Sequence, residues 1–481
     1  MLINILSLYI ITPYTINAVG DQYYGLWTLI ASFTGYYFLL DFGISSTVIK
    51  FVAKSIADKN LIERDILVSN AFFLFTFISL IALLPILIIS FGFYHFSPEE
   101  LKTISVILIL IAGFEFMVCL PLKVFQGVAY AYLDYPVSSL LDILKTIIRA
   151  VGIFLLIYHR EDIIFLPVIS LTTSIFYYVC ISYFVFSRHK LKISWNQVSK
   201  KELLALTGFS KYLFITQIGD LLRFRIDYIV ISMMLSLESI TIYAIAQKLA
   251  DVYMQVIMKM LGVLNPLIFQ LSSETDSIKR VDTYFNCIRI SCILSFAIGT
   301  SIIVSASLLI SLWMGDNYLQ AVTILSFLVF ALSMDLIQIP SHAILQSIEK
   351  HHYFSWLTII EGVCNLILSI ILGLNYGLIG IVLGTVIPMT TIKILVLPYF
   401  LCRESGMSLK YYYQVILGPL SLAVVISTFV FYILLPEINF HSQFLNLIFT
   451  FTIQFCLYIL FSMMLFLSKT EQKTLINKFI K

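Results

Sequence analysis

The sequence predicts an all-α integral membrane protein with about 14 transmembrane helices, built as two six-helix repeats followed by two further helices. The first observation is composition: 60% of the 481 residues are hydrophobic and only 12% are charged, whereas soluble domains are about half apolar and a quarter charged. The second is that apolar runs of about 20 residues, the length that crosses the hydrocarbon layer, recur along the whole chain. The third is that features of the first six runs return in the next six.

Each apolar run is bounded by a short polar, proline or glycine segment and is therefore a predicted helix. The first run has no basic flank and no small-residue cleavage site, so we expect a span rather than a signal peptide. In chain order, the predicted spans are residues 1–17, 24–50, 66–93, 102–127, 135–158, 163–187, 205–235, 240–270, 284–312, 319–347, 353–374, 377–401, 412–435 and 443–468.

The repeat is visible as matched residues at a constant separation. Tyr24 is matched by Tyr243, Pro121 by Pro340 and Asp142 by Glu361. Units of six spans keep one orientation in the membrane, which is typical of alternating-access transporters; chance coincidence among aromatic-rich helices is the alternative. The predicted organisation is an N-terminal six-helix bundle (1–187), a basic cytoplasmic linker (188–204), a C-terminal six-helix bundle (205–401), and two extra helices with a basic cytoplasmic tail (402–481).

Lys and Arg lie mainly in the loops that follow even-numbered spans. The loop at 188–204 is rich in them, whereas the loops after odd-numbered spans hold little beyond Lys102 and Arg160. Because cytoplasmic loops carry the excess of positive residues, we expect both termini to be cytoplasmic.

Charged residues also lie inside the predicted spans, where each costs about 2.5 to 3.5 kcal/mol at the centre of a lipid-facing helix. They must therefore face protein or water. Three stripes have the spacing of one helical face. These are Asp142, Lys145 and Arg149 in the fifth span; Asp220, Arg223 and Asp227 in the seventh, with Arg225 to the side; and Lys248, Asp251, Gln255 and Lys259 in the eighth.

Stripes turned toward one another would line a hydrated cavity between the two halves. Cations slightly outnumber acids, so the cavity suits an anionic ligand, while the acids suit a coupling cation. The alternative is that the stripes are salt-bridge ladders or snorkelling residues, a reading that also fits Lys211, Arg289 and Lys393 near helix ends. The candidate ligand-binding cations are Arg149, Lys145, Arg223, Arg225, Lys248 and Lys259, and the candidate cavity or coupling acids are Asp41, Asp142, Asp220, Asp227, Asp251 and Glu361.

Motifs for other chemistry are missing from the sequence. The seven cysteines form no CxxC pair or Cys/His cluster, so no metal site or disulfide framework is expected. A P-loop, a GxSxG elbow, an HExxH pair and a dinucleotide fingerprint are absent. We therefore expect a secondary transporter rather than an enzyme, with no cofactor and no nucleic-acid partner.

The N-terminal run SLYIITPYTINAVGDQYYGLWTLIASFTGYYFLLDFGISSTVIKFVAKSIAD resembles the start of the polysaccharide transporter family, the O-antigen and capsule flippases of the MATE-like MOP superfamily. Similar features are a first span with a TP pair, a YGLW turn, a GYxxLLDxG second span and a basic exit. The segments RIDYIVISMML and YAIAQKLADVY are similar to the seventh and eighth spans of that family.

The resemblance implies a flippase that moves undecaprenyl-pyrophosphate-linked oligosaccharides from the cytoplasmic to the periplasmic leaflet of the bacterial inner membrane. It also implies coupling to H⁺ or Na⁺, contact with membrane lipid, and work beside a polysaccharide polymerase and a chain-length regulator in lipopolysaccharide or capsule synthesis.

Two other functions are considered. A cation-coupled multidrug antiporter on the same fold would have mostly acids in its cavity, against which Arg149 and Arg223 argue. A membrane-embedded polymerase would need a larger outward loop than the one near Phe93–Leu101.

Overall fold

The computed structural model describes residues 2–37, 41, 44–159, 162–271, 277–350, 352–434 and 442–466. These residues form helices and connecting turns without a strand, so the predicted all-α membrane fold is confirmed. Nine helices or helix pairs within this part of the chain are long and apolar enough to cross a membrane. Helix α7 (Tyr135–His159), which carries three charged residues, is not among the nine. The count of fourteen spans stays a prediction.

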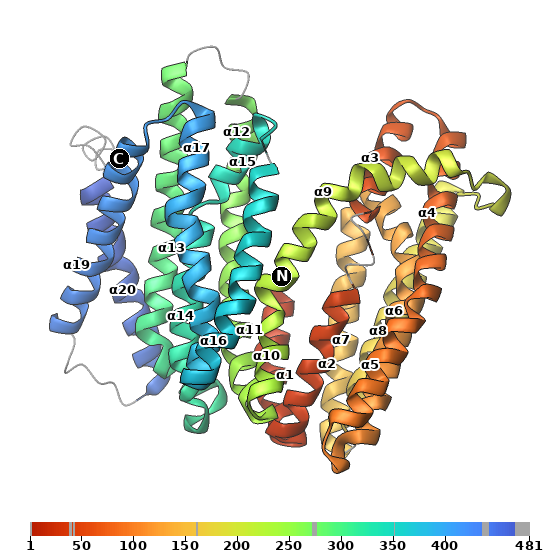
Figure 1. Cartoon of the computed structure of the whole chain (residues 1–481), viewed down its shortest axis with the longest axis horizontal. Helices are drawn as coiled ribbons and strands as arrows, with labels where there is room; N and C mark the ends of the chain where they lie inside the picture. The colour runs from red at the N-terminus through yellow and green to blue at the C-terminus, as the bar shows by residue number, and fades with distance from the viewer. Residues whose placement is uncertain are drawn as a thin grey trace. The chain divides into compact units, whose positions relative to one another are not determined.

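The chain divides into two compact units, which are drawn in Figure 1. The N-terminal unit comprises Met1–Ser232 with Ser236–Thr241, and the C-terminal unit comprises Met233–Leu235 with Ile242–Lys481. Packing defines these units, whereas sequence similarity defines the predicted six-span repeats, and the limits of the repeats stay a prediction.

Helix α6 is central to the N-terminal unit, where it packs against α2 to α5 and α8; α7 packs between α8 and α1 (Figure 1). Two buried apolar clusters, one around Phe75 and Phe125 and the other around Ile86 and Leu108, hold these helices together. The helices are α1 (Leu2–Val19), α2 (Asp21–Tyr37), α3 (Ile44–Ala57), α4 (Leu61–Ile81), α5 (Leu83–Phe96), α6 (Lys102–Ala131), α7, α8 (Phe165–His189), α9 (Lys200–Phe224) and α10 (Ile226–Met234).

Several predicted spans are divided into two or more helices, among them the spans at 66–93, 240–270 and 319–347. Two of the divided spans carry candidate site residues at the break. The span predicted at 24–50 comprises α2 and α3, with Asp41 between them. The span predicted at 205–235 changes helix at Arg225, where φ is −121° and the helical hydrogen-bond pattern restarts. An uninterrupted apolar pattern predicts the length of a span but gives no signal for such a break.

Gly25, in the YGLW turn of the sequence, marks a close helix crossing. A Cβ atom on Gly25 would lie 2.0 Å from the carbonyl oxygen of Leu237. The Thr241 hydroxyl donates to the Asp21 carbonyl over 2.7 Å at the same crossing. The start of α11 (Leu237–Leu261) is thereby fixed to α2.

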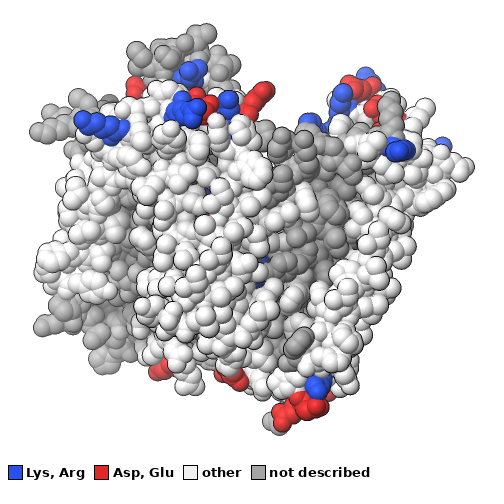
Figure 2. Space-filling view, in the orientation of Figure 1, with Lys and Arg blue, Asp and Glu red and all other residues white. Residues whose placement is uncertain are grey.

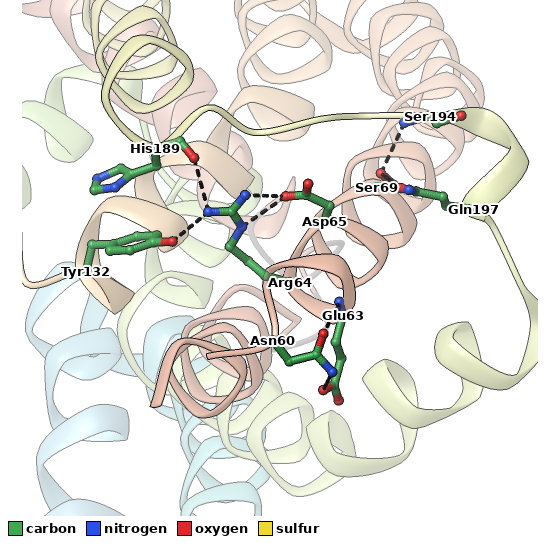
Figure 3. A network of polar contacts seen from close by, with 9 residues as sticks. All are labelled: Asn60, Glu63, Arg64, Asp65, Ser69, Tyr132, His189, Ser194 and Gln197. Atoms are coloured by element: carbon green, nitrogen blue, oxygen red, sulfur yellow. Dashed lines mark hydrogen bonds and ion pairs between the residues drawn. The ribbon is translucent and has the colours of Figure 1, made fainter. Parts of the chain in front are cut away.

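The segment between α8 and α9 is bound to the N-terminal half of α4 through the polar network of Figure 3. Ser69 donates to the Gln197 side chain over 3.0 Å and accepts from the Ser194 amide over 3.2 Å. Buried Arg64 donates to Asp65, to the Tyr132 hydroxyl and to the His189 carbonyl. The predicted linker is therefore packed against the N-terminal unit along part of its length.

The C-terminal unit is organised around α13 and α14, which pack against α20 and α16 respectively. At Gly377 (φ 58°, ψ −136°) α16 is interrupted and continues as a second helix, in agreement with the separate spans predicted at 353–374 and 377–401. The remaining elements are α12 (Asn265–Leu271), α13 (Ser277–Met314), α14 (Gln320–Leu336), α15 (Ile339–Ser347), α16 (His352–Thr391), the π-helical turn η6 (Ile392–Val396), α17 (Leu397–Ser405), α18 (Leu409–Tyr412), the π-helical turn η7 (Tyr413–Leu417), α19 (Gly418–Leu434) and α20 (Gln443–Phe466).

Charged side chains gather at the ends of the helices in each unit, as Figure 2 shows for the face in view. The helix sides between these ends are almost free of Lys, Arg, Asp and Glu. Helix sides that face lipid must be largely free of charged side chains, and this distribution meets that requirement. The few charges inside the units therefore stand out as candidates for function.

Candidate functional site

A polar cluster lies inside the N-terminal unit, where α6, α7 and α8 pack together. The Glu115 carboxylate of α6 accepts hydrogen bonds from Ser170 over 3.2 Å and from Ser174 over 2.7 Å. Both cations of the predicted α7 stripe, Lys145 and Arg149, are half-buried and lie within electrostatic range of Glu115. We call Glu115, Lys145 and Arg149 the N-terminal cluster. It holds two cations and one acid.

Tyrosine rings border this cluster. The Lys145 ammonium lies 5.6 Å from the centre of the Tyr177 ring, a cation–π arrangement. The Gln126 amide donates to the hydroxyls of Tyr177 and Tyr130 over 2.7 and 3.1 Å. The third member of the predicted stripe, Asp142, has an exposed side chain and lies within electrostatic range of Lys145. Inside the cluster itself, two cations lie near the half-buried Glu115.

Asp41 has a buried place between α2 and α3, with 2% of its surface exposed. Its carboxylate accepts from the Ser45 hydroxyl over 2.6 Å and from the Ser45 amide over 3.3 Å, in the first turn of α3. The Lys123 ammonium of α6 lies 3.4 Å away on the other side. The Asp41 side chain thus caps the start of α3 and forms an ion pair with Lys123 of α6.

An apolar groove of about 410 Å³ runs between α1 and α7 in the same unit. Its walls include Leu6 and Ile10 of α1 and Ile147, Ala150 and Phe154 of α7, and polar groups contribute almost nothing to them. The groove also includes Thr146 and Ile153, which stand three residues before and four residues after Arg149. The apolar face of α7 therefore adjoins its cationic face.

A second polar cluster lies inside the C-terminal unit. Lys393, in η6, is 2.9 Å from an Asp335 oxygen of α14 and 3.6 Å from a Glu361 oxygen of α16. The side chains of Lys393 and Glu361 are both 1% exposed, and that of Asp335 is 14% exposed. We call these three residues the C-terminal cluster. It holds two acids and one cation.

Of the two readings given for Lys393, snorkelling to an interface is wrong because the side chain is buried, whereas a structural salt bridge agrees with its two ion pairs. A π-helical turn lets the helix run through Ile392–Val396 between α16 and α17, and Lys393 is buried there against two carboxylates. The Gln338 amide donates to the Lys393 carbonyl over 2.8 Å and to the Tyr412 hydroxyl over 3.0 Å. The position of the π turn cannot be read from hydropathy.

The two clusters occupy corresponding places in the predicted repeat. Each is built from the fourth, fifth and sixth spans of its own six-span unit, and Glu361 is the residue matched to Asp142. Their charge balance is opposite, because one has an excess of cations and the other an excess of acids. An anionic ligand suits the first cluster, and a positive ion suits the second.

The four charged residues predicted in the seventh span differ in their burial. Arg223 and Asp227 are buried, with 3% and 0% exposure, whereas Asp220 and Arg225 are exposed. The Arg223 guanidinium lies 4.6 Å from the Phe224 ring centre. Because the helix breaks at Arg225, the four residues do not form one continuous polar face.

The predicted stripe of the eighth span lies on α11. The Gln247 amide donates to Asp251 over 2.8 Å, and Asp251 and Lys248 are both half-buried. Lys259, at the C-terminal end of the helix, is exposed. The stripe therefore leads from a half-buried start to an exposed end, and a shared cavity between the halves stays a prediction.

Lys123, the partner of Asp41, is not among the residues predicted from the sequence. It lies in the fourth span, eight residues after Glu115. This spacing corresponds to about two helical turns, so it indicates that the two side chains lie on the same side of the helix. Asp335 and Lys393 belong to none of the three predicted stripes, so spacing gives no reason to place them in a site. Among the described residues, no group of three His, Cys, Asp or Glu side chains could hold a metal ion.

Comparison with known proteins places the chain among relatives with this architecture. Over 98% of its length it is 22% identical to "Uncharacterized membrane protein EpsK" of Bacillus subtilis, covering 94% of that protein. Over 47% of each chain it is 24% identical to "Probable low-salt glycan biosynthesis flippase Agl15" of Haloferax volcanii.

Solved structures show the same fold at low sequence identity. The lipid II flippase MurJ in an inward closed conformation superposes with a TM-score of 0.71 at 17% identity, over 96% of this chain and 98% of that one. An inward-facing multidrug resistance MATE family transporter of the MOP superfamily gives 0.66 at 17% identity, over 84% and 95%. The predicted MATE-like arrangement is thus confirmed. The family model for polysaccharide biosynthesis proteins matches residues 1–272, and the chain belongs to this family.

Proposed function

We propose that the protein is a flippase for polyprenyl-pyrophosphate-linked oligosaccharides, with undecaprenyl as the expected carrier, and that it works by ion-coupled alternating access. The single observation that carries this proposal is the construction of α7. One face of α7 bears Lys145 and Arg149, and the adjoining face forms the wall of an apolar groove. An anion with a long hydrocarbon tail needs both surfaces side by side.

The cationic face suits the pyrophosphate. A pyrophosphate keeps its charge during translocation, and an uncompensated anion in a low-dielectric interior is prohibitively costly. The Arg149 guanidinium stays charged when partly desolvated and binds phosphate oxygens in a fork, while Lys145 adds a second positive charge. Tyr177, beside Lys145, offers an aromatic ring of the kind that packs against sugars.

The apolar groove suits the polyprenyl chain. Its α1 and α7 walls are almost purely hydrocarbon, so a tail lying there exchanges lipid contacts for protein contacts without desolvating polar groups. The tail would then remain outside the polar interior while the headgroup enters it. The relatives support the same substrate class, since one is named a glycan biosynthesis flippase and a solved neighbour is a lipid II flippase.

The cellular setting follows from the same proposal. Such a substrate is made on the cytoplasmic leaflet and used on the periplasmic leaflet, so we place the protein in the bacterial inner membrane with both termini in the cytoplasm. A polysaccharide polymerase and a chain-length regulator are the expected partners, and O-antigen or capsule repeat units are the expected glycans.

A cation-coupled multidrug antiporter is the alternative on this fold, and a MATE transporter is among the structural neighbours. The N-terminal cluster weighs against it, because two cations and one acid would repel a cationic drug. A membrane-embedded polymerase is less favoured still, because the described turn between α5 and α6 is only a short 3₁₀ segment at Glu99–Leu101.

Complementation of a flippase-null strain tests the headgroup role. We expect Arg149→Ala to abolish surface glycan, and Arg149→Lys to retain part of it because the charge remains without the fork. The same pattern is expected at Arg223. Arg188→Ala, which removes an exposed arginine at the end of α8, is the matched control and should export normally. Full export by an Arg149→Ala protein present at wild-type level on a blot would refute the headgroup role.

The tail role is tested in the same strain by filling the groove. Ala150→Trp places an indole in the groove and should strongly reduce export, whereas Leu140→Trp, at an exposed site on the same helix, should not. Equal export by the two variants at equal abundance would show that the tail travels elsewhere.

A further inference from the structure

We infer that two serines of α8 hold the Glu115 carboxylate away from the two cations of the N-terminal cluster, which therefore stay open to the pyrophosphate. The identity of that ligand rests on the proposed function, whereas the positioning of the acid does not. The serines are Ser170 and Ser174, which donate to Glu115 over 3.2 and 2.7 Å. Both hydrogen bonds end on the same carboxylate oxygen, Oε1.

The two serines are placed to reach this acid. Ser170 and Ser174 stand four residues apart, which is about one turn of α8, so they share one face of the helix. Ser174 is buried, with 5% exposure, and Ser170 is half-buried. The hydroxyls of the neighbouring Thr172 and Thr173 donate instead to carbonyls of their own helix. The serine hydroxyls therefore serve the acid of α6 rather than the helix that carries them.

The two cations lie near the acid without pairing with it. Lys145 and Arg149 are within electrostatic range of Glu115. The side chain of neither forms a hydrogen bond or an ion pair with any residue that the structure describes. A carboxylate and a guanidinium at close range normally form direct and often bidentate hydrogen bonds. The bonds from the serines explain why Glu115 does not, because they fix its Oε1 atom against α8.

An acid beside these cations has a use in transport, because a substrate that is carried must be released as well as bound. Carboxylate and phosphate groups are alternative partners for the same guanidinium. Held at a distance, Glu115 repels the pyrophosphate and limits how tightly the cations retain it. Paired directly with Arg149, the same carboxylate would occupy the site. The serines therefore set the balance between binding and release.

Substitutions of the acid and of the serines should have opposite effects on pyrophosphate binding. Glu115→Gln keeps an oxygen that accepts from the serines but removes the negative charge, so it should tighten binding about fivefold. Ser170→Ala combined with Ser174→Ala frees the acid to pair with the cations, so it should weaken binding about fivefold. In the triple variant the acid has no charge, and binding should match that of Glu115→Gln. Thr172→Ala, which removes a hydroxyl bonded to its own helix, is the matched control.

The probe is tritiated geranyl pyrophosphate, a short and soluble polyprenyl pyrophosphate. Its dissociation constant is measured on the purified full chain in lipid nanodiscs, with empty nanodiscs subtracted, and Arg149→Ala should lose most of the binding. Wild-type affinity in the double serine variant would overturn the inference, as would equal weakening by serine removal with and without the Glu115 charge. Binding that does not depend on Arg149, or no binding by the wild type, would instead contradict the headgroup role in the proposed function.

Thermal unfolding without a ligand tests the positioning of Glu115 separately from the proposed function. Arg149→Ala should lower the unfolding temperature more in the double serine variant than in the wild type, because Glu115 pairs with Arg149 once the serines are removed. This difference should vanish when Glu115→Gln is added to both proteins. An equal effect of Arg149→Ala in the two backgrounds would show that the serines do not hold the acid back, and would overturn the inference whatever the ligand.

Discussion

Asp41 is held by two kinds of contact that predict different outcomes for its removal. Its bonds to Ser45 stabilise the start of α3, and its pair with Lys123 joins α3 to α6. Removing one member of a buried pair costs about 3 to 5 kcal/mol because the other charge is left in a poorly solvated place. Lys123, whose side chain is 19% exposed, retains some access to solvent, so the lower value is expected.

We therefore predict that Asp41→Ala lowers transport and costs about 3 kcal/mol of stability. In the double variant Asp41→Ala, Lys123→Met, the unpaired charge is gone, so stability should recover except for about 1 kcal/mol from the lost bonds to Ser45, while transport stays low. Unfolding temperature in detergent and export in cells are the two measurements. If the double variant recovers both, the pair serves packing alone.

Charged site residues were predictable from sequence to the extent that helical spacing reveals them. Lys145 and Arg149 share a face of α7 as expected, because four residues make about one turn. The partners could not be found in this way. Glu115 meets them from α6 and Lys393 meets Glu361 from η6, and such encounters depend on tertiary packing between helices far apart in the chain.

At the scale of elements, close helix crossings depend on single glycines. A Cβ at position 25 would approach the Leu237 carbonyl to 2.0 Å, and backbone at that point cannot rotate away as a side chain can. Gly384 is in a similar position against Ser369, where the two helices of α16 pack together. The close crossing gives a physical reason for a glycine at position 25, whereas the sequence alone shows this glycine only as part of the YGLW resemblance.

Gly25→Ala should therefore force α2 and the start of α11 apart, with a loss of about 1 to 3 kcal/mol, the usual cost of overpacking. Gly92→Ala is the matched control, because a Cβ there meets nothing within 4 Å and alanine favours the helix. Thermal unfolding of both purified variants in detergent is the measurement. Equal stability of the two would mean that the crossing relaxes without cost.

Helix breaks mark the limit of what the apolar pattern predicts. The pattern gave the position of the turn at Gly377, since the sequence there interrupts two long apolar runs. It gave no sign of the division of the second span around Asp41 or of the seventh at Arg225. These two breaks lie beside charged residues, whereas the break at Ala82 lies in a wholly apolar stretch, so charge alone does not predict where a span divides.

At the scale of the whole molecule, the two units carry equivalent clusters of opposite sign. In the predicted repeat, the fourth span supplies an acid to each cluster, Glu115 or Asp335, so the difference in charge lies in the other spans. The fifth span supplies Lys145 and Arg149 to the N-terminal cluster and Glu361 to the C-terminal cluster. A single six-span plan can therefore carry clusters of opposite charge.

The orientation of the chain in the membrane is the last prediction. In the N-terminal unit, the segment between α8 and α9 holds Lys190 and Lys192, whereas the turn between α5 and α6 holds two acids and no lysine. Three helices, α6, α7 and α8, run between these segments, so the segments lie at opposite ends of the helices, and Lys/Arg-rich ends stay in the cytoplasm. Alkaline phosphatase, which is active only in the periplasm, should therefore give no signal when fused after Lys481 and a strong signal when inserted at Pro98. Matched blots must show both fusions at equal abundance. A strong signal after Lys481 would reverse the orientation, and with it the direction in which the proposed substrate is carried.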